Sequence, residues 1–463
     1  MISLLSRLRV YLLLGLLFPS HVFSAEEPEG EWLVLSGSNT IGAKLGPSWA
    51  HDFLTHKGVT NIEVRSIGTN EFKITGTTTE EKQVWITVRA HGSSTGFKSL
   101  EAGTADIGMA SRAIKNSEVD ALSKLSNAGM ENAEHVVAID GLSIIVNPNN
   151  AIDSLDLKDI QSIFLGKIKN WKELGGADKA IKLHARDNNS GTWDTFKTLV
   201  LKGEANLSRS AKRYESNDEL AADVVKIPGA IGFVALSSVG SAKVVAVSDG
   251  NNPRMLPNKA LVATEDYPLA RRLYLYTNQI NKSPFVQEFI NFAVSYEGQQ
   301  IVEQVGFISQ NPQLMKTQVV NGPKFYQSLS EQGLRVSMNF RFSLKGATLD
   351  SKAKYDVQRL ATFLTQADHS NYRVQLVGFS HPSESESFDT IISKLRASAV
   401  KRELFQYKVQ TEPVVGMGSQ HTIASGSGRN DRVEVWLYKG HMSSYRHSDG
   451  IFPTEAETTI VSN

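Results

Sequence analysis

Three segments of the chain place glycine and hydroxyl side chains just before a helical pattern, at residues 37–42, 92–96 and 186–192. A helix N-terminus offers backbone N–H groups and the positive end of its dipole. Glycine lets the backbone approach a ligand, and Ser and Thr hydroxyls add donors. The third segment adds Arg186, whose planar guanidinium matches phosphate or carboxylate oxygens. Together the segments predict a cradle for a tetrahedral oxyanion.

Other interpretations of these segments remain open. Any one of them alone also fits ordinary helix capping. Residues 92–96 fit the G-x-S-x-G elbow of a serine hydrolase, although no oxyanion-hole motif accompanies them and nothing marks a catalytic Asp or His. Residues 37–42 resemble a phosphate-binding loop of a nucleotide triphosphatase, but Ala43 stands where that loop requires Lys.

Composition excludes several further classes of site. The chain has no cysteine, which removes thiol nucleophiles, Fe–S clusters, Cys-type zinc sites and disulfides. The 11 histidines show no metal-ligand spacing, so we expect no metal and no cofactor. Lys+Arg minus Asp+Glu is 49 − 48 = +1, so no overall field attracts nucleic acid.

The length of 463 residues predicts two or three domains. The first segment has the pattern of a targeting signal. Arg7 and Arg9 precede an apolar run at 10–18, and small residues follow up to Ala25. This pattern predicts a secretory signal peptide over 1–25, with an N-terminal membrane anchor as the alternative. We therefore expect an exported protein.

The remaining elements divide into two units. From about 30 to 310, strand-like and helix-like patterns alternate, which predicts an α/β unit with a mainly parallel sheet covered by helices. Residues 313–332 form a polar connector. From 333 to 440, strict period-two alternation at 334–343 opens an α+β unit of βαβαβ type. The tail, 441–463, is polar and expected to be disordered.

The first unit resembles the periplasmic phosphate-binding proteins of ABC importers, the PstS-like family. The resemblance rests on residues 92–112, 138–147, 163–171, 185–192 and 229–233. It implies a bilobed, type II periplasmic-binding fold over 26–312, non-covalent capture of phosphate, no enzymatic activity, and an ABC importer membrane complex as a partner. The phosphate-binding positions that it implies are Thr40, Ile41, Ser93, Arg186, Ser190, Gly191 and Thr192.

One position departs from that family. Its best-known members place an Asp after the strand at 106–110, to accept the proton of hydrogen phosphate, whereas this chain has Ser111. A binding site that offers only hydrogen-bond donors discriminates poorly between hydrogen phosphate, which carries a proton, and sulfate, which does not. Asp140, which follows another apolar strand, could supply the acceptor or could cap a turn. The selectivity between phosphate and other oxyanions is therefore open.

The second unit resembles the OmpA-like domain that binds peptidoglycan, on residues 340–342, 376–379, 393–397, 416–418 and 430–434. In that family an Asp and an Arg grip the diaminopimelate of the stem peptide. Arg396 occupies the Arg position and His381 the Asp position. The alternative for Arg396 is a solvated charge on a helix face.

We therefore expect a periplasmic phosphate-binding protein, associated with the cell wall or outer membrane through an OmpA-like domain. Two alternatives stay open. One is a wall-anchored scaffold or adhesion protein with a vestigial pocket, and the other is a phosphatase built on the same pocket.

Overall fold

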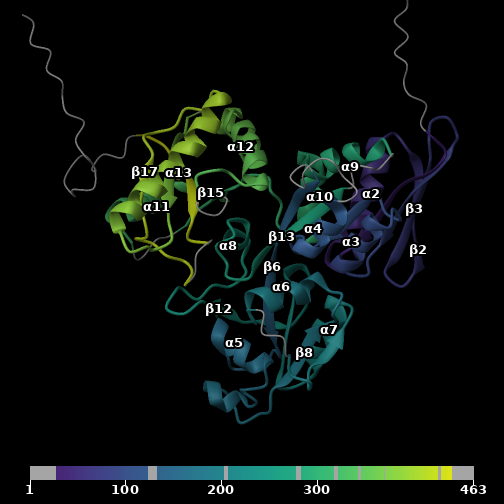
Figure 1. Cartoon of the computed structure of the whole chain (residues 1–463), viewed down its shortest axis with the longest axis horizontal. Coiled ribbons are helices and arrows are strands. Elements are labelled where there is room, and N and C mark those ends of the chain that lie inside the picture. Colours follow the sequence, from purple (N-terminus) through teal and green to yellow (C-terminus); the bar gives the residue numbers. More distant parts are fainter. Residues whose placement is uncertain are drawn as a thin grey trace, which may run out of the picture.

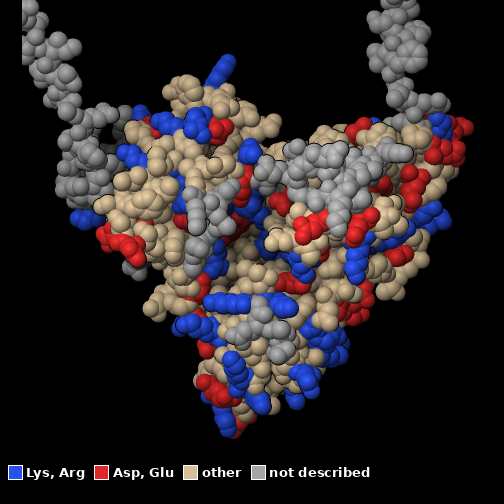
Figure 2. Space-filling model, in the orientation of Figure 1, with Lys and Arg blue, Asp and Glu red and all other residues tan. Residues whose placement is uncertain are grey.

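The computed structural model describes residues 28–123, 133–202, 207–277, 283–317, 322–342, 346–369, 371–425 and 429–440. The predicted signal peptide at 1–25 and the tail at 441–463 lie outside these residues. The described chain forms three bodies, which meet around a central hollow (Figures 1 and 2). We call them lobe 1, lobe 2 and the C-terminal domain. In Figure 1 they lie at the right, at the bottom and at the left.

One sheet runs through both lobes in the order β2-β3-β4-β1-β5-β13-β6-β10-β8-β9. Its lobe 1 strands are β1 (Gly30–Gly37), β2 (Thr60–Gly68), β3 (Glu71–Thr77), β4 (Gln83–Arg89), β5 (Ile107–Ala110) and β13 (Ala270–Thr277). The helices of lobe 1 are α1 (Asn39–Gly42), α2 (Leu45–His56), α3 (Ser93–Glu101), α4 (Asn116–Ser123), α9 (Phe285–Val294) and α10 (Tyr296–Val305). Their apolar faces bury a core around Trp49, Phe53 and Phe289.

The long strand β6 (Glu134–Val146) carries the sheet into lobe 2, because it pairs with β13 along its first part and with β10 along its last. The other lobe 2 strands are β7 (Ser154–Asp156), β8 (Lys182–Arg186), β9 (Lys212–Tyr214), β10 (Ala230–Ala235), β11 (Lys243–Val244) and β12 (Ala246–Ser248). Its helices are α5 (Leu157–Phe164), α6 (Gly191–Leu199) and α7 (Asn217–Lys226). The chain returns to lobe 1 through residues 249–269, which include α8 (Lys259–Ala263).

The C-terminal domain has a sheet in the order β14-β15-β18-β16-β17. Its elements are β14 (Leu314–Met315), α11 (Lys324–Gln332), β15 (Leu334–Phe340), α12 (Ser351–Leu364), β16 (Arg373–Phe379), α13 (Glu386–Gln406), β17 (Val415–Gly416) and β18 (Arg432–Tyr438). The order β15-α12-β16-α13-β18 is the predicted βαβαβ pattern. Buried Val336, Met338 and Phe340 of β15 face a core shared with α12 and α13.

The structure differs from the sequence prediction in two places. The large sheet is mixed, because β2-β3-β4 and β13-β6 are antiparallel while β1 is parallel to β4 and β5. The connector 313–332 contains β14 and α11, which pack on the C-terminal domain because Tyr326 and Leu329 are buried. Among the described residues, no helix is long and apolar enough to cross a membrane.

Candidate functional site

The third predicted loop joins β8 to α6 in lobe 2. Arg186 is the last residue of β8, and Gly191 and Thr192 open α6. The Ser190 hydroxyl oxygen caps α6, since it accepts the N–H groups of Thr192 at 3.1 Å and Trp193 at 3.4 Å. The capping role is therefore present, and the hydroxyl proton of Ser190 stays available to donate to a ligand.

Arg186 is the most informative side chain of this loop, because it is a buried cation with an unused donor. Only 1% of it is exposed. Its Nε donates to the carbonyl of Tyr214 at 3.2 Å and its Nη2 to the carbonyl of Glu215, while buried Nη1 has no hydrogen-bond partner among the described residues. Burial lowers the pKa of Arg186 to about 10, so it is charged at neutral pH. A buried charged donor without a partner is costly, and an anion would satisfy it.

The first and second loops lie in lobe 1. Thr40 and Ile41 belong to α1, Ser93 opens α3, and Ser111 follows β5. The Ser111 N–H donates to the Ser93 hydroxyl oxygen at 3.0 Å, and the two hydroxyl oxygens are 3.5 Å apart. The Ile41 side chain packs in the lobe 1 core, which leaves its backbone for a ligand. The buried Ser38 hydroxyl also has no partner among the described residues. Sequence reasoning missed Ser38, although it lies inside segment 37–42.

The three loops meet because the two lobes are in contact. The hydroxyl oxygens of Thr40 in lobe 1 and Thr192 in lobe 2 are 3.1 Å apart. A Cβ at Gly92 would lie 2.1 Å from the carbonyl oxygen of Asn189, and one at Gly191 would lie 2.2 and 2.4 Å from the hydroxyl oxygens of the two lobe 1 serines. The loops therefore approach so closely that only glycine fits at both places.

Arg271 joins this group, and sequence reasoning did not identify it. It lies on β13 opposite Asp140 of β6, and its Nε and Nη2 donate to Asp140 Oδ2 at 2.9 and 2.6 Å. Its Nη1 donates to the Thr192 hydroxyl at 2.9 Å, and its Nη2 lies 3.5 Å from the Thr40 hydroxyl. Asp140 Oδ1 accepts the N–H of Leu236 at 3.1 Å. Arg271 thus connects the loops of both lobes.

The charges of the group favour an anion. Asp140 is fully buried, and burial raises its pKa while Arg271 opposes that rise. Both Asp140 oxygens already accept protein donors, so its role as acceptor of a ligand proton remains a prediction. The group contains two cations, Arg186 and Arg271, and one carboxylate, that of Asp140, so its net charge is positive. Two adjacent arginines inside the otherwise apolar strand 270–277 were the signal in the sequence that could have identified Arg271.

The elbow motif at 92–96 has a different local chemistry. The hydroxyl of Ser94, which would be the nucleophile, accepts from Arg112 Nη2 at 3.2 Å. Arg112 is held by Glu118 and Asp194 at 2.7 Å each. Within the described ranges no histidine hydrogen-bonds to Ser94, and no group of His, Asp and Glu is arranged to hold a metal.

The C-terminal domain brings the predicted wall-binding residues together around an additional carboxylate. Arg396 of α13 is 4% exposed, and its Nη1 donates to Asp431 Oδ1 at 2.7 Å. The backbone N–H of His381 donates to the same oxygen at 2.7 Å. Arg396 Nε donates to the carbonyl of Gly346 at 3.1 Å, and the guanidinium lies over the Phe342 ring. Sequence reasoning missed the role of Asp431. We call Arg396, His381 and Asp431 the clamp.

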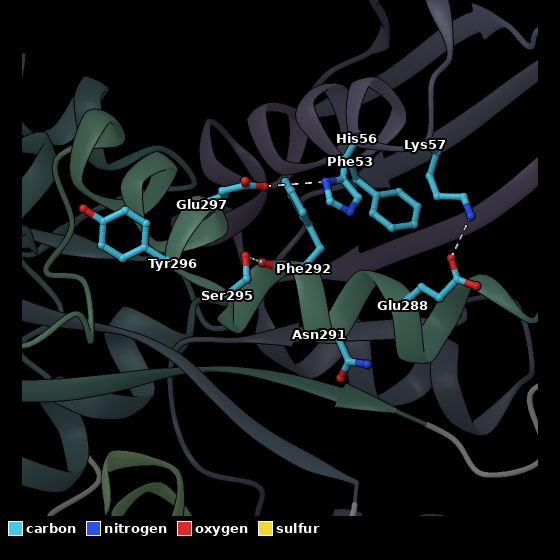
Figure 3. A pocket seen from close by; sticks show the side chains of 9 residues that line it. All are labelled: Phe53, His56, Lys57, Glu288, Asn291, Phe292, Ser295, Tyr296 and Glu297. Atoms are coloured by element: carbon cyan, nitrogen blue, oxygen red, sulfur yellow. Dashed lines mark hydrogen bonds and ion pairs between the residues drawn. The ribbon is translucent and has the colours of Figure 1, made fainter. Parts of the chain in front are cut away.

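A separate pocket of about 710 Å³ lies on lobe 1 between α2, α9 and α10 (Figure 3). Its charged side chains are already paired, because Lys57 lies 3.0 Å from Glu288 and His56 lies 3.5 Å from Glu297. None of the predicted site residues lines it.

Comparison with known proteins identifies both units. Residues 66–297 match the model of the PBP superfamily domain, and residues 341–435 match that of the OmpA family. The phosphate-binding protein PstS of Bacillus subtilis is 34% identical over 225 residues, which are 48% of this chain and 70% of that protein. PstS of Staphylococcus aureus is 27% identical over 237 residues, which are 49% of this chain and 70% of that protein.

Among solved structures, an ABC-type phosphate transport receptor from Vibrio cholerae matches with 26% identity and a TM-score of 0.46. The match covers 60% of this chain and 99% of that one. The two family-model matches fall on different parts of the chain, one within the two lobes and the other within the C-terminal domain. The chain therefore belongs to the PBP superfamily, with a PstS-like phosphate-binding domain followed by a domain of the OmpA family.

Proposed function

We propose that this protein captures inorganic phosphate between its two lobes and is held at the cell wall by its OmpA-like domain. The observation that carries the phosphate site is the buried guanidinium of Arg186, whose Nη1 has no partner among the described residues and which starts the loop that brings the Thr192 hydroxyl against the hydroxyls of lobe 1. Thr40, Ser93, Ser111, Ser190 and Thr192 supply those hydroxyls. Capture is non-covalent, because the donors replace the hydration shell of the anion.

Calorimetric titration of the exported chain with phosphate, sulfate and arsenate tests this proposal. We expect phosphate to bind, and Arg186→Gln to weaken it by about a hundredfold or more, since breaking a buried charge pair costs roughly 3–5 kcal/mol. Arg209→Gln is the matched control, because Arg209 is an exposed arginine of the same lobe. Unchanged affinity in Arg186→Gln would place the anion elsewhere.

The titration also separates the alternatives. A pocket that binds none of the three anions would favour a wall-anchored scaffold or adhesion protein. Release of phosphate from a phosphomonoester by the purified chain would favour a phosphatase. The resemblance to importer proteins makes an ABC importer membrane complex the expected recipient of the bound phosphate.

The wall-binding part of the proposal rests on the clamp. The Arg396 guanidinium suits a carboxylate of diaminopimelate, and the Asp431 carboxylate suits its ammonium group. Peptidoglycan lies outside the cytoplasmic membrane, so this ligand agrees with the signal peptide predicted at 1–25 and with a periplasmic location. Retention on purified peptidoglycan is the direct measurement, and the variants that test it are given in the Discussion.

A further inference from the structure

The OmpA-like domain has a second surface, distinct from the clamp, that packs on the phosphate domain. It follows the return segment 249–269, which carries the chain from β12 of lobe 2 to β13. We call the paired strands β13 and β6, where the sheet crosses between the lobes, the hinge. Figure 1 shows α8 of this segment beside β15. The surface contacts both ends of the segment.

At the lobe 2 end the contacts centre on Asp249, which directly follows β12. Arg429 Nη2 donates to Asp249 Oδ2 at 2.7 Å, and the Ser425 N–H donates to the same oxygen at 3.1 Å. Ile423 is 4% exposed and belongs to the same apolar cluster as Val247 of β12. Residues 423–425 and Arg429 of the OmpA-like domain are therefore attached to lobe 2.

At the hinge end the contacts centre on Asp266, which is 3% exposed. Arg335 of β15 donates to Asp266 Oδ2 at 2.8 Å, and Asn339 donates to Oδ1 at 2.9 Å. Arg272, next to Arg271 on β13, lies 2.8 Å from Asp350 of the OmpA-like domain. One face of β15 is therefore buried against the hinge.

The OmpA-like domain also contacts lobe 1 directly. Arg359 of α12 donates to the Gln310 side-chain oxygen at 3.0 Å, and Gln313, which precedes β14, donates through Nε2 to Glu303 Oε1 of α10 at 2.7 Å. Thus one folded domain touches lobe 2, the hinge and lobe 1 at once. A cavity of about 800 Å³ remains where the three bodies meet, and Arg271 forms part of its wall (Figure 2).

Binding proteins with two lobes release their ligand by hinged opening. The contacts with lobe 2 and those with lobe 1 exist together while the lobes are closed, and a rotation that separates the lobes would break one set. We propose that the OmpA-like domain is a brace across the hinge, which favours the closed lobes, tightens phosphate binding and slows phosphate release. This inference rests on the proposed phosphate function.

The test uses the full exported chain with single substitutions at the lobe 2 end. Asp249→Asn keeps the shape of the side chain, Arg429→Gln shortens it, and each removes the ion pair. We expect each to weaken phosphate binding by about fivefold to tenfold and to speed release by a similar factor, within the range of ordinary coupling energies. The double variant should bind phosphate about as tightly as either single variant, because each single substitution already removes the Asp249–Arg429 ion pair. Asp178→Asn is the matched control, since Asp178 pairs with exposed Lys172 and no contact of that pair reaches the OmpA-like domain.

A second measurement reports the lobes without phosphate. The chain has no cysteine, so Lys98→Cys on α3 and Lys158→Cys on α5 place one spin label on each lobe. We expect longer label distances in Asp249→Asn than in the parent when both are phosphate-free. If the parent binds no phosphate, the proposed function fails, and the distances still test the brace. If the parent binds phosphate and neither affinity nor distances change in the variants, the brace is overturned and the function stands.

Discussion

At the scale of single residues, the two buried arginines of the phosphate site have different tasks. Arg186 has an unused N–H, whereas Arg271 donates to Asp140, Thr192 and Thr40. Arg186 therefore suits direct contact with the anion. Arg271 suits a positioning role, because it holds hydroxyls of both lobes in place.

The role of Asp140 can be separated by its effect on selectivity. If Asp140 positions Arg271, Asp140→Asn should weaken phosphate and sulfate binding by a similar factor, since it leaves Arg271 without its buried carboxylate. If Asp140 accepts the ligand proton, phosphate alone should lose about tenfold or more, for a lost acceptor costs roughly 1–3 kcal/mol. Titration of both anions, with circular dichroism to confirm folding, decides between them. We expect the first outcome, because both carboxylate oxygens accept protein donors.

The clamp supports a prediction on wall binding. Arg396→Ala and Asp431→Asn should each reduce co-sedimentation with peptidoglycan, because each removes one partner of the diaminopimelate end group. His381→Asp should strengthen binding, because it adds a second carboxylate for the ammonium group.

Lys394→Ala is the control for these variants, because Lys394 is exposed on the same helix. Unchanged retention of both Arg396→Ala and Asp431→Asn would mean that the clamp binds no stem peptide.

At the scale of elements, the site depends on the close approach of two helix N-termini, those of α3 and α6. Gly191→Ala would place a Cβ 2.2 Å from the Ser93 hydroxyl, so the lobes could not reach the observed contact. We expect phosphate affinity to fall at least about tenfold while thermal stability changes little, because the backbone of Gly191 is helical. Gly68→Ala is the control, since its nearest neighbour would be 3.5 Å away. Unchanged affinity in Gly191→Ala would contradict the closed arrangement.

Strand β6, which crosses between the lobes, makes stability depend on pH through His135. Burial lowers the pKa of His135 from 6.5 to about 4, and its Nε2 has no partner among the described residues. Between these two values the unfolded chain binds the proton more readily, so the free energy of unfolding should fall as pH drops from about 6.5 to 4. The full loss is on the order of 3 kcal/mol.

Urea denaturation at pH 7.5 and pH 4.5 measures this loss. His135→Leu should reduce it, whereas His56→Gln, at an exposed position, should leave it nearly unchanged. An equal loss in His135→Leu and the wild type would assign the acid sensitivity to other groups.

At the scale of the whole molecule, the domains are joined by buried carboxylates. Burial alone would raise the pKa of Asp266, but Arg335 of the C-terminal domain lowers it to about 2. Burial would likewise raise the pKa of Glu265, but it is lowered to about 2 by Arg272 of its own domain and by Lys352 and Arg341 of the C-terminal domain. Groups with lowered pKa contribute stability above their unfolded pKa and lose it as pH falls toward the folded value. The domain contact should therefore persist to about pH 4 and weaken between pH 4 and 2.

Removing one carboxylate should separate the domains at neutral pH. In Asp266→Asn, the one ionic partner left to Arg335 within the described part of the chain is Glu434, at 3.3 Å. The loss of a buried pair costs roughly 3–5 kcal/mol, so calorimetry should resolve separate unfolding transitions for the two domains. Asp178→Asn, remote from this contact, should unfold as the wild type does. A single transition at an unchanged temperature in Asp266→Asn would contradict the prediction.

Local sequence patterns were enough to predict much of this molecule. The glycine and hydroxyl pattern of the three loops depends on helix capping and backbone approach, which act within a few residues, and it singled out Ser93 and Thr192, which lie where the two lobes meet. Period-two alternation likewise predicted β15, because it reports which face of a strand is apolar.

The partners of charged side chains were decided only by the tertiary structure. Arg271 and Asp140 are 131 residues apart and meet because β13 and β6 pair in one register. Arg335 and Asn339 lie on the polar face of β15, and they are buried because that face packs on the hinge. The hydrophobic pattern shows that a residue is polar, but it does not show whether water or a charged residue distant in the sequence is its partner. That choice depends on how the domains and strands come together, so only the folded chain could make it.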